Sequence, residues 1–159
     1  MFHKLVLLRD EIEEEFRHLY ELEKQLKKLQ EKIINDSQIE KRVYASILSD
    51  FYMAIERIFK LIAKEIDDQL PEGDEWHKKL LRQMSVEIPL IRPAVITKTL
   101  FYKLEDYLKF RHLVRNIYGF QLEYNRFNYL IKDMNSVAAE VAEQVKSFLN
   151  DMQDIAKNI

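Results

Sequence analysis

Apolar residues recur every three or four positions along most of the chain, which is the spacing of an amphipathic helix. The pattern predicts four long helices. In the first two, the apolar positions run over residues 5–33 and 43–66, and the other two are expected from Thr97 or Thr99 to Ile117 and from about Tyr124 to Ala156. No stretch shows the regular alternation of apolar and polar residues that is typical of a half-buried strand.

Turn-forming residues separate these helices. Asn35-Asp36-Ser37 predicts a turn and an N-cap, and residues 70–74 (Leu-Pro-Glu-Gly-Asp) interrupt the second apolar pattern. Asp74 is then expected to cap a short helix that reaches Met84, and Gly119 to end the third long helix as its C′ residue. Residues 85–96 should form an ordered, partly buried loop. The prediction is an all-α fold, an antiparallel four-helix bundle with one short extra helix, in a single domain over residues 1–159.

The composition agrees with a helical protein and excludes several classes. There are only two glycines and three prolines. Cysteine is absent, which excludes a disulfide framework and thiolate chemistry. No apolar run approaches the roughly 18 residues of a membrane span, and the first residues lack the layout of a signal peptide. We therefore expect a soluble, cytoplasmic protein with no membrane segment.

The net charge of −2 is unevenly distributed. Residues 77–115 contain nine Lys or Arg residues and three acids, so this segment carries +6 and the remainder −8. Such a concentration of positive charge favours an anionic ligand, and nucleic acid is the first candidate.

The stretch over residues 110–119 is the candidate functional site. Arg111, Arg115 and Tyr118 stand at positions i, i+4 and i+7 and are predicted to share one helix face, while His112 and Asn116 lie one turn apart on another side. The structural alternative is an exposed charge pair of Arg111 and Arg115, with Tyr118 in the core. Metal-ligand, glycine-loop and nucleophile motifs are all missing from the sequence, so we expect no metal and no cofactor.

The same stretch resembles the signature of HEPN-domain ribonucleases. In that signature an arginine is followed, after four intervening residues, by a residue with a polar ring (histidine), and a tyrosine stands two positions further on. Two further pieces are similar to the HepT-like toxins of HEPN/MNT toxin–antitoxin pairs: Glu75-Trp76-His77-Lys78-Lys79-Leu80-Leu81 and Glu87-Ile88-Pro89-Leu90-Ile91-Arg92-Pro93-Ala94-Val95. The resemblance implies a homodimer whose two motif helices form one cleft, and metal-independent cleavage of RNA by attack of a 2′-hydroxyl on the adjacent phosphate.

The resemblance also assigns roles to residues of this chain. Arg111 matches the catalytic arginine, and Tyr118, a further residue of the catalytic site, matches the tyrosine that a partner MNT-type nucleotidyltransferase antitoxin modifies with AMP. We expect His112 and Arg115 to support RNA binding. The family's catalytic histidine falls on position 116, where this chain has asparagine. An amide binds phosphate but does not transfer protons near pH 7, and loss of general acid–base catalysis typically slows a reaction about 10²–10⁴-fold.

Three explanations of Asn116 are open: an engineered inactivating substitution, a natural loss that leaves an RNA-binding or regulatory protein, or proton transfer by His112 instead. The leading hypothesis is an endoribonuclease toxin of the HEPN type, inactive or weakened by Asn116, with RNA as substrate and an MNT-type antitoxin as partner. The alternative is a non-catalytic helical module that binds RNA or protein.

Overall fold

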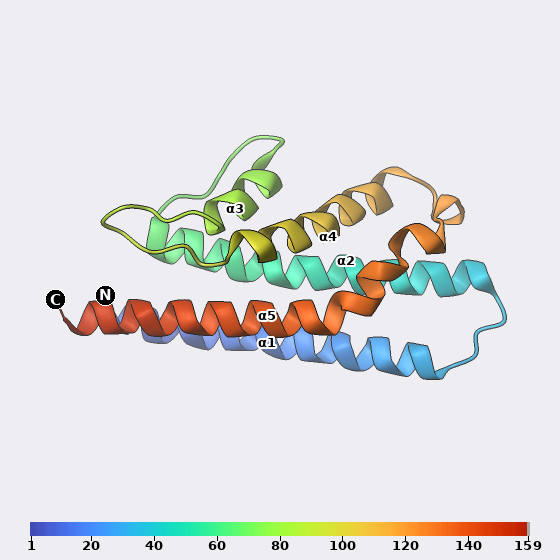
Figure 1. The fold of residues 1–159 in the computed structure, drawn as a ribbon, viewed down its shortest axis with the longest axis horizontal. Helices are drawn as coiled ribbons and strands as arrows, with labels where there is room; N and C mark the ends of the chain where they lie inside the picture. The colour runs from blue at the N-terminus through green and yellow to red at the C-terminus, as the bar shows by residue number, and fades with distance from the viewer. Residues whose placement is uncertain (159) are drawn as a thin grey trace.

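The computed structural model of the protein describes residues 1–158. It contains five α-helices: α1 (Phe2–Glu31), α2 (Ser37–Ile62), α3 (Trp76–Met84), α4 (Lys98–Asn116) and α5 (Tyr124–Lys157). Figure 1 shows the four long helices alternating in direction, with the short α3 packed outside them, and the two chain termini together at one end. The predicted all-α bundle with one short extra helix is confirmed.

Helix α2 is the central element of the bundle. It contacts α1, α3, α4 and α5, and twelve of its residues are buried. Phe51, Ile55 and Phe59 have no exposed surface, and full burial of such side chains contributes about 1.5–3 kcal/mol each. A π-helical turn, η1 (Ala63–Asp67), continues α2, and Asp68 ends it in the left-handed region with φ of 53°. Because α2 packs against four other helices, the residues on its exposed face also have a fixed position.

Two of the predicted helix boundaries are confirmed and two are wrong. The Asp36 carboxylate accepts hydrogen bonds from the backbone N–H groups of Gln38 and Ile39, as an N-cap does. Thr97 is the N-cap of α4 and accepts from the N–H of Leu100. Asp74, in contrast, does not cap α3. The N-cap position is Glu75, and its side chain makes no capping hydrogen bond.

Gly119 is also not the C′ residue of α4. The helix ends at Asn116, its C-cap Ile117 is extended, and Gly119 begins a 3₁₀ turn, η2 (Gly119–Gln121). Glycine leaves room here for the Arg42 guanidinium, since a Cβ at position 119 would lie 2.6 Å from Cζ of Arg42 and this group would have to move. The predicted apolar stripes also extend too far, because Ile33 is 94% exposed and Ile155 is exposed as well.

The segment from 85 to 96 is the ordered, partly buried loop that was predicted. Val95 and Ile96 are buried. The buried Arg92 guanidinium pairs with Asp67 and donates hydrogen bonds to the backbone oxygens of Gln83, Val86 and Pro93. Over residues 1–158, no helix combines the length and the apolar character that crossing a membrane requires.

Candidate functional site

Arg111 lies in the wall of the bundle and not on its surface. Only 8% of the residue is exposed, and its Nη1 atom lies 3.2 Å from Oε1 of Glu56 on α2, which is 5% exposed. The structural alternative, an arginine facing water, is therefore wrong for this residue. A buried ion pair of this kind fixes the position of both side chains, because separating them would leave a charge without a partner in a low-dielectric environment.

The Glu56 carboxylate has a second partner that sequence reasoning missed. Nδ1 of His77, on α3, lies 2.6 Å from Oε2 of Glu56. The His77 ring stacks on Trp76 at 3.6 Å between centroids, and Nζ of Lys60 lies 4.3 Å from the centre of the Trp76 ring. One carboxylate thus connects three helices. The sequence did contain a signal for this cluster, since Glu56 is an acid inside the apolar pattern of the second helix.

His112 and Asn116 lie one turn apart on the same side of α4, as their spacing predicts. Both residues are exposed, and Nδ2 of Asn116 donates a hydrogen bond to the backbone oxygen of His112 at 2.6 Å. The same amide nitrogen lies 3.4 Å from Nε2 of His112. The imidazole of His112 therefore stands next to the position where the family signature has its histidine.

Tyr118 lies outside the helix that was expected to carry it. Because α4 ends two residues earlier, Tyr118 has extended backbone angles, with φ of −73° and ψ of 145°. It therefore does not share a helix face with Arg111 and Arg115, which corrects that prediction. The residue is 71% exposed, so it is not part of the core. Its ring stacks on Phe120 at 5.4 Å between centroids, and its N–H donates to Gln121.

A hollow of about 400 Å³ lies between α2, α4 and the η2 turn, and we call it the α2–α4 hollow. Its charged lining residues are Arg42, Asp50, Arg111 and Arg115, three cations against one anion. The structure therefore brings Arg111 and Arg115 together in one concave surface. His112, Asn116 and Tyr118 are not among its lining residues and lie at the exposed end of α4 instead.

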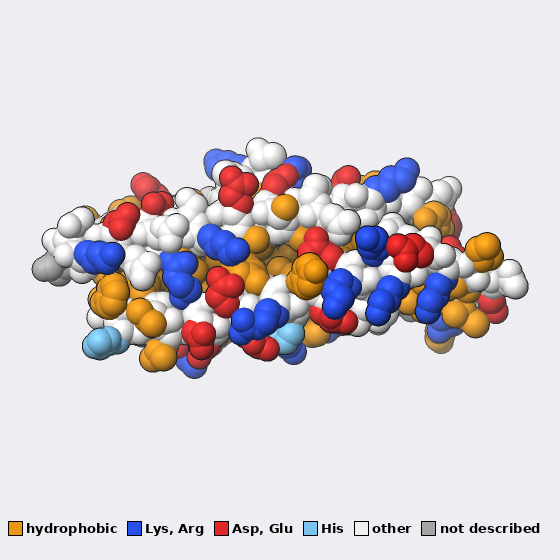
Figure 2. Space-filling view, turned by 90° about the horizontal axis from the view of Figure 1, so that it is seen from below, with side chains coloured by type: hydrophobic (Ala, Val, Ile, Leu, Met, Phe, Trp, Pro, Cys, Tyr) orange, Lys and Arg blue, Asp and Glu red, His pale blue; other side chains and the backbone are white. Residues whose placement is uncertain are grey.

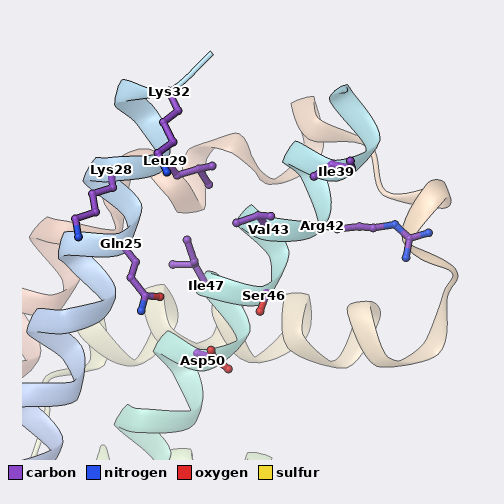
Figure 3. Close-up of a pocket in the computed structure, with 10 residues that line it drawn as sticks. All are labelled: Gln25, Lys28, Leu29, Lys32, Ile39, Arg42, Val43, Ser46, Ile47 and Asp50. Atoms are coloured by element: carbon purple, nitrogen blue, oxygen red, sulfur yellow. The ribbon is translucent and has the colours of Figure 1, made fainter. Parts of the chain in front are cut away.

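A second concave surface of about 520 Å³ lies between α1 and α2, and we call it the α1–α2 groove. Figure 3 shows Leu29, Val43 and Ile47 along it, with Lys28 and Lys32 on its α1 side. Arg42 points away from α1 in this view, consistent with its guanidinium group lying over Gly119. Arg42 thus belongs to both concave surfaces but presents its charge to the α2–α4 hollow.

The predicted basic segment 77–115 is less positive at the surface than its sequence suggests. Five of its nine cations pair with acids, namely Lys78–Glu75, Arg92–Asp67, Lys103–Glu140, Lys109–Glu105 and Arg111–Glu56. Figure 2 shows other basic side chains over the right half of the face formed by α1 and α5, where the C-terminal half of α1 lies. The exposed lysines of that half are Lys24, Lys27, Lys28 and Lys32.

The buried Tyr52 lies close to the Arg111–Glu56 pair. Burial raises the pKa of the Tyr52 hydroxyl, and the nearby Glu56 carboxylate raises it further, while Arg111 lowers it. Burial likewise raises the pKa of Tyr107, whose hydroxyl donates to the backbone oxygen of Leu130 at 2.7 Å. Both phenols are therefore neutral near pH 7. Over residues 1–158 there is also no group of three or more His, Cys, Asp or Glu side chains arranged to hold a metal ion.

The segment that forms this site matches a known family. Residues 43–152, from the first turns of α2 to near the end of α5, match the family model described as HepT-like protein. The chain belongs to the HepT-like family. The resemblance to HepT-like HEPN proteins is thereby confirmed at the level of the family, and all five candidate residues lie within the matched range. Neither a curated protein nor a solved structure matches the chain.

Proposed function

We propose that this HepT-like protein is an endoribonuclease toxin of the HEPN type, which cleaves RNA in the cytoplasm without a metal ion and is paired with an MNT-type nucleotidyltransferase antitoxin. The observation that carries the proposal is the convergence of Arg111 and Arg115, within the family-matched segment, on one concave surface. Guanidinium groups suit this chemistry because their planar fork binds phosphate oxygens in a bidentate manner.

The chain lacks a proton carrier at position 116, where the family signature has its histidine. The ribose 2′-oxygen forms a bond to phosphorus, the bond from phosphorus to the 5′-oxygen of the next nucleotide breaks, and a 2′,3′-cyclic phosphate results. The 2′-hydroxyl loses a proton and the leaving 5′-oxygen gains one. Arg111, held by Glu56, would stabilise the negative charge that develops on the phosphorane oxygens. Asn116 would orient the phosphate through its amide without moving a proton.

A homodimer in which the ends of two α4 helices meet would complete the site. The end of α4 and the turn after it carry three large apolar side chains that are exposed to solvent in the single chain. They are Leu113, Tyr118 and Phe120, between 46% and 71% exposed. A second copy packed there would remove this apolar surface from water and bring two sets of Arg111, Asn116 and Tyr118 to one cleft.

Restoring histidine at position 116 tests the enzyme hypothesis. We expect Asn116→His to cleave single-stranded RNA in the presence of a chelator, at least about 100-fold faster than the parent chain. A further Arg111→Lys change, which keeps a cation beside Glu56 but removes the fork, should reduce that rate. If folded, dimeric Asn116→His leaves every RNA intact, the ribonuclease proposal is rejected. His112→Ala in both backgrounds determines whether His112 supplies residual proton transfer.

The exposed Tyr118 hydroxyl supports the proposed regulation. The phenolic oxygen would attack the α-phosphate of ATP in the antitoxin's active site, with transfer of AMP to the tyrosine and release of pyrophosphate. Tyr118→Phe should abolish the mass increase that incubation with antitoxin and ATP produces. Tyr102, also exposed on α4, provides the matched control Tyr102→Phe. An unchanged AMP mass on Tyr118→Phe would rule out this tyrosine as the modified residue.

A specific observation also favours the second candidate function, a non-catalytic helical module that binds RNA or protein. Asn116 does not titrate near pH 7, and its amide is already engaged with the His112 carbonyl. The same experiment separates the two functions, because a binding module gains no cleavage from histidine at position 116.

A further inference from the structure

One of the residues that line the α2–α4 hollow carries a buried polar atom with no hydrogen-bond partner. Oγ of Ser49 is buried and makes no hydrogen bond, and over residues 1–158 it is the one buried side-chain nitrogen or oxygen in this state. Ser49 lines the hollow. A buried hydroxyl without a hydrogen bond is unfavourable by about 1–3 kcal/mol. Rotation about the Cα–Cβ bond would turn this hydroxyl into the basic hollow, where an oxygen atom of a ligand would accept its hydrogen bond.

Arg42 is the second unusual residue of the same wall. Its side chain forms no ion pair and no hydrogen bond among the described residues, whereas Arg111 in the same lining pairs with Glu56. Its guanidinium group occupies the space that the missing side chain of Gly119 leaves open. Because Glu56 pairs with Arg111, the charges left in the lining are the cations Arg42 and Arg115 against the anion Asp50, an excess of one positive charge. An anion would balance this excess.

Two contacts fix the alignment of α2 against α4 and the turn after it. Glu56 on α2 pairs with Arg111, and Arg42 covers Gly119. Ser49 lies seven residues from both Glu56 and Arg42, so it stands between these two fixed points, about 10 Å along the helix axis from each. Arg115 stands midway between Arg111 and Gly119 in the sequence. The hollow thus presents its cations and the free hydroxyl in a row, not at a single point.

We propose that Ser49 and Arg42, both outside the arginine–asparagine signature, bind the sugar–phosphate backbone of a single-stranded RNA. Ser49 donates a hydrogen bond to a phosphate oxygen that Arg115 also contacts, and Arg42 pairs with a neighbouring phosphate of the same strand. A volume of about 400 Å³ lies within the usual range for small-ligand sites. This inference rests on the proposed function for the identity of its ligand, but it concerns binding and does not require cleavage.

The test is a binding titration of the full chain with a fluorescent 2′-O-methyl oligoribonucleotide, which lacks the attacking hydroxyl, over a range of salt concentrations. Ser49→Ala should weaken binding about tenfold with an unchanged salt dependence, because a neutral donor to a charged acceptor is lost. Arg42→Gln should weaken binding and reduce the slope of log K against log salt by about 0.7, the value for one phosphate contact of a single strand. Arg57→Gln is the matched control, since Arg57 is an exposed arginine of α2 outside the hollow. It should bind within about twofold of the parent.

Thermal unfolding of each variant excludes loss of structure as the cause, and Ser49→Ala should be no less stable than the parent, since it removes an unpaired hydroxyl. If Ser49→Ala and Arg42→Gln bind as Arg57→Gln does, the inference is overturned, whatever cleavage Asn116→His shows. If inorganic phosphate binds in a Ser49-dependent manner but the oligonucleotide does not, the hollow is a site for free phosphate and the RNA assignment is overturned. If Ser49-dependent RNA binding is found while Asn116→His is inert, this inference stands and the ribonuclease proposal fails.

Discussion

Removing the negative charge of Glu56 is the perturbation whose effect the structure predicts most directly. Glu56→Gln keeps the shape of the side chain but leaves the 8% exposed Arg111 guanidinium without an anion. It also leaves one acceptor oxygen, in place of two, for Arg111 and His77. Breaking a buried ion pair by removing one partner typically destabilises a protein by about 3–5 kcal/mol. For a chain of this size that corresponds to a fall in Tm of roughly 6–20 °C.

The assay is thermal and urea unfolding, measured at two protein concentrations because association of copies would raise the apparent stability. Glu140→Gln is the control. Its partner Lys103 lies at a short 2.6 Å but near the surface, so this variant should lose no more than about 1 kcal/mol. Should Glu56→Gln unfold at the same temperature as Glu140→Gln, then Glu56 does not hold Arg111 as described, and the argument that the bundle fixes this arginine is wrong.

Three further outcomes follow from single contacts. Gly119→Ala should change the free energy of unfolding by no more than about 0.5 kcal/mol, because the flexible end of Arg42 can move away from the new Cβ. The same displacement of Arg42 should lower the RNA affinity of the Gly119→Ala variant toward that of Arg42→Gln. Asp36→Ala should lose about 1 kcal/mol of stability in urea unfolding, since it removes the N-cap of α2. Tyr52 and Tyr107 have raised pKa values in the folded chain. The stability that their neutral hydroxyls contribute is therefore complete below about pH 10 and is lost at higher pH. Absorbance at 295 nm should show that both tyrosines ionise only when the protein unfolds.

The bundle could be predicted from the sequence because its cause is local and repeated. Apolar spacing determines which face of each helix is buried, and that pattern is readable over many turns. Single boundary residues were harder. Asp36 is the N-cap within the stretch Asn35-Asp36-Ser37 where one was predicted, whereas Asp74, an equally good capping residue, does not cap its helix. Gly119 has the sequence features of a C′ glycine, but its role depends on Arg42, a residue 77 positions earlier.

The candidate site shows the same division between local and distant contacts. The neighbourhood of His112 and Asn116 follows from helical spacing within α4 and was predicted correctly. The partners of Arg111 could not be found in this way, because Glu56 lies 55 positions away and His77 approaches from a third helix. Only packing brings these side chains together, and a buried acid in an apolar pattern gives no indication of which cation it meets.

Stability alone gives no reason for an ion pair at positions 56 and 111. Two apolar side chains of similar volume would fill the same space without the loss of hydration that buried charges suffer, and such replacements often leave stability unchanged or higher. What an apolar pair cannot supply is a guanidinium group held at a fixed place in the wall of the α2–α4 hollow. Helix α2 is packed against every other α-helix, so Glu56 has a fixed position in the core and holds Arg111 in place. Ser49 and Arg42 lie on the same helix and line the hollow, so their backbone positions are fixed as well. The position of the cations is therefore determined by the core, as a site that must place several groups around a phosphate chain requires.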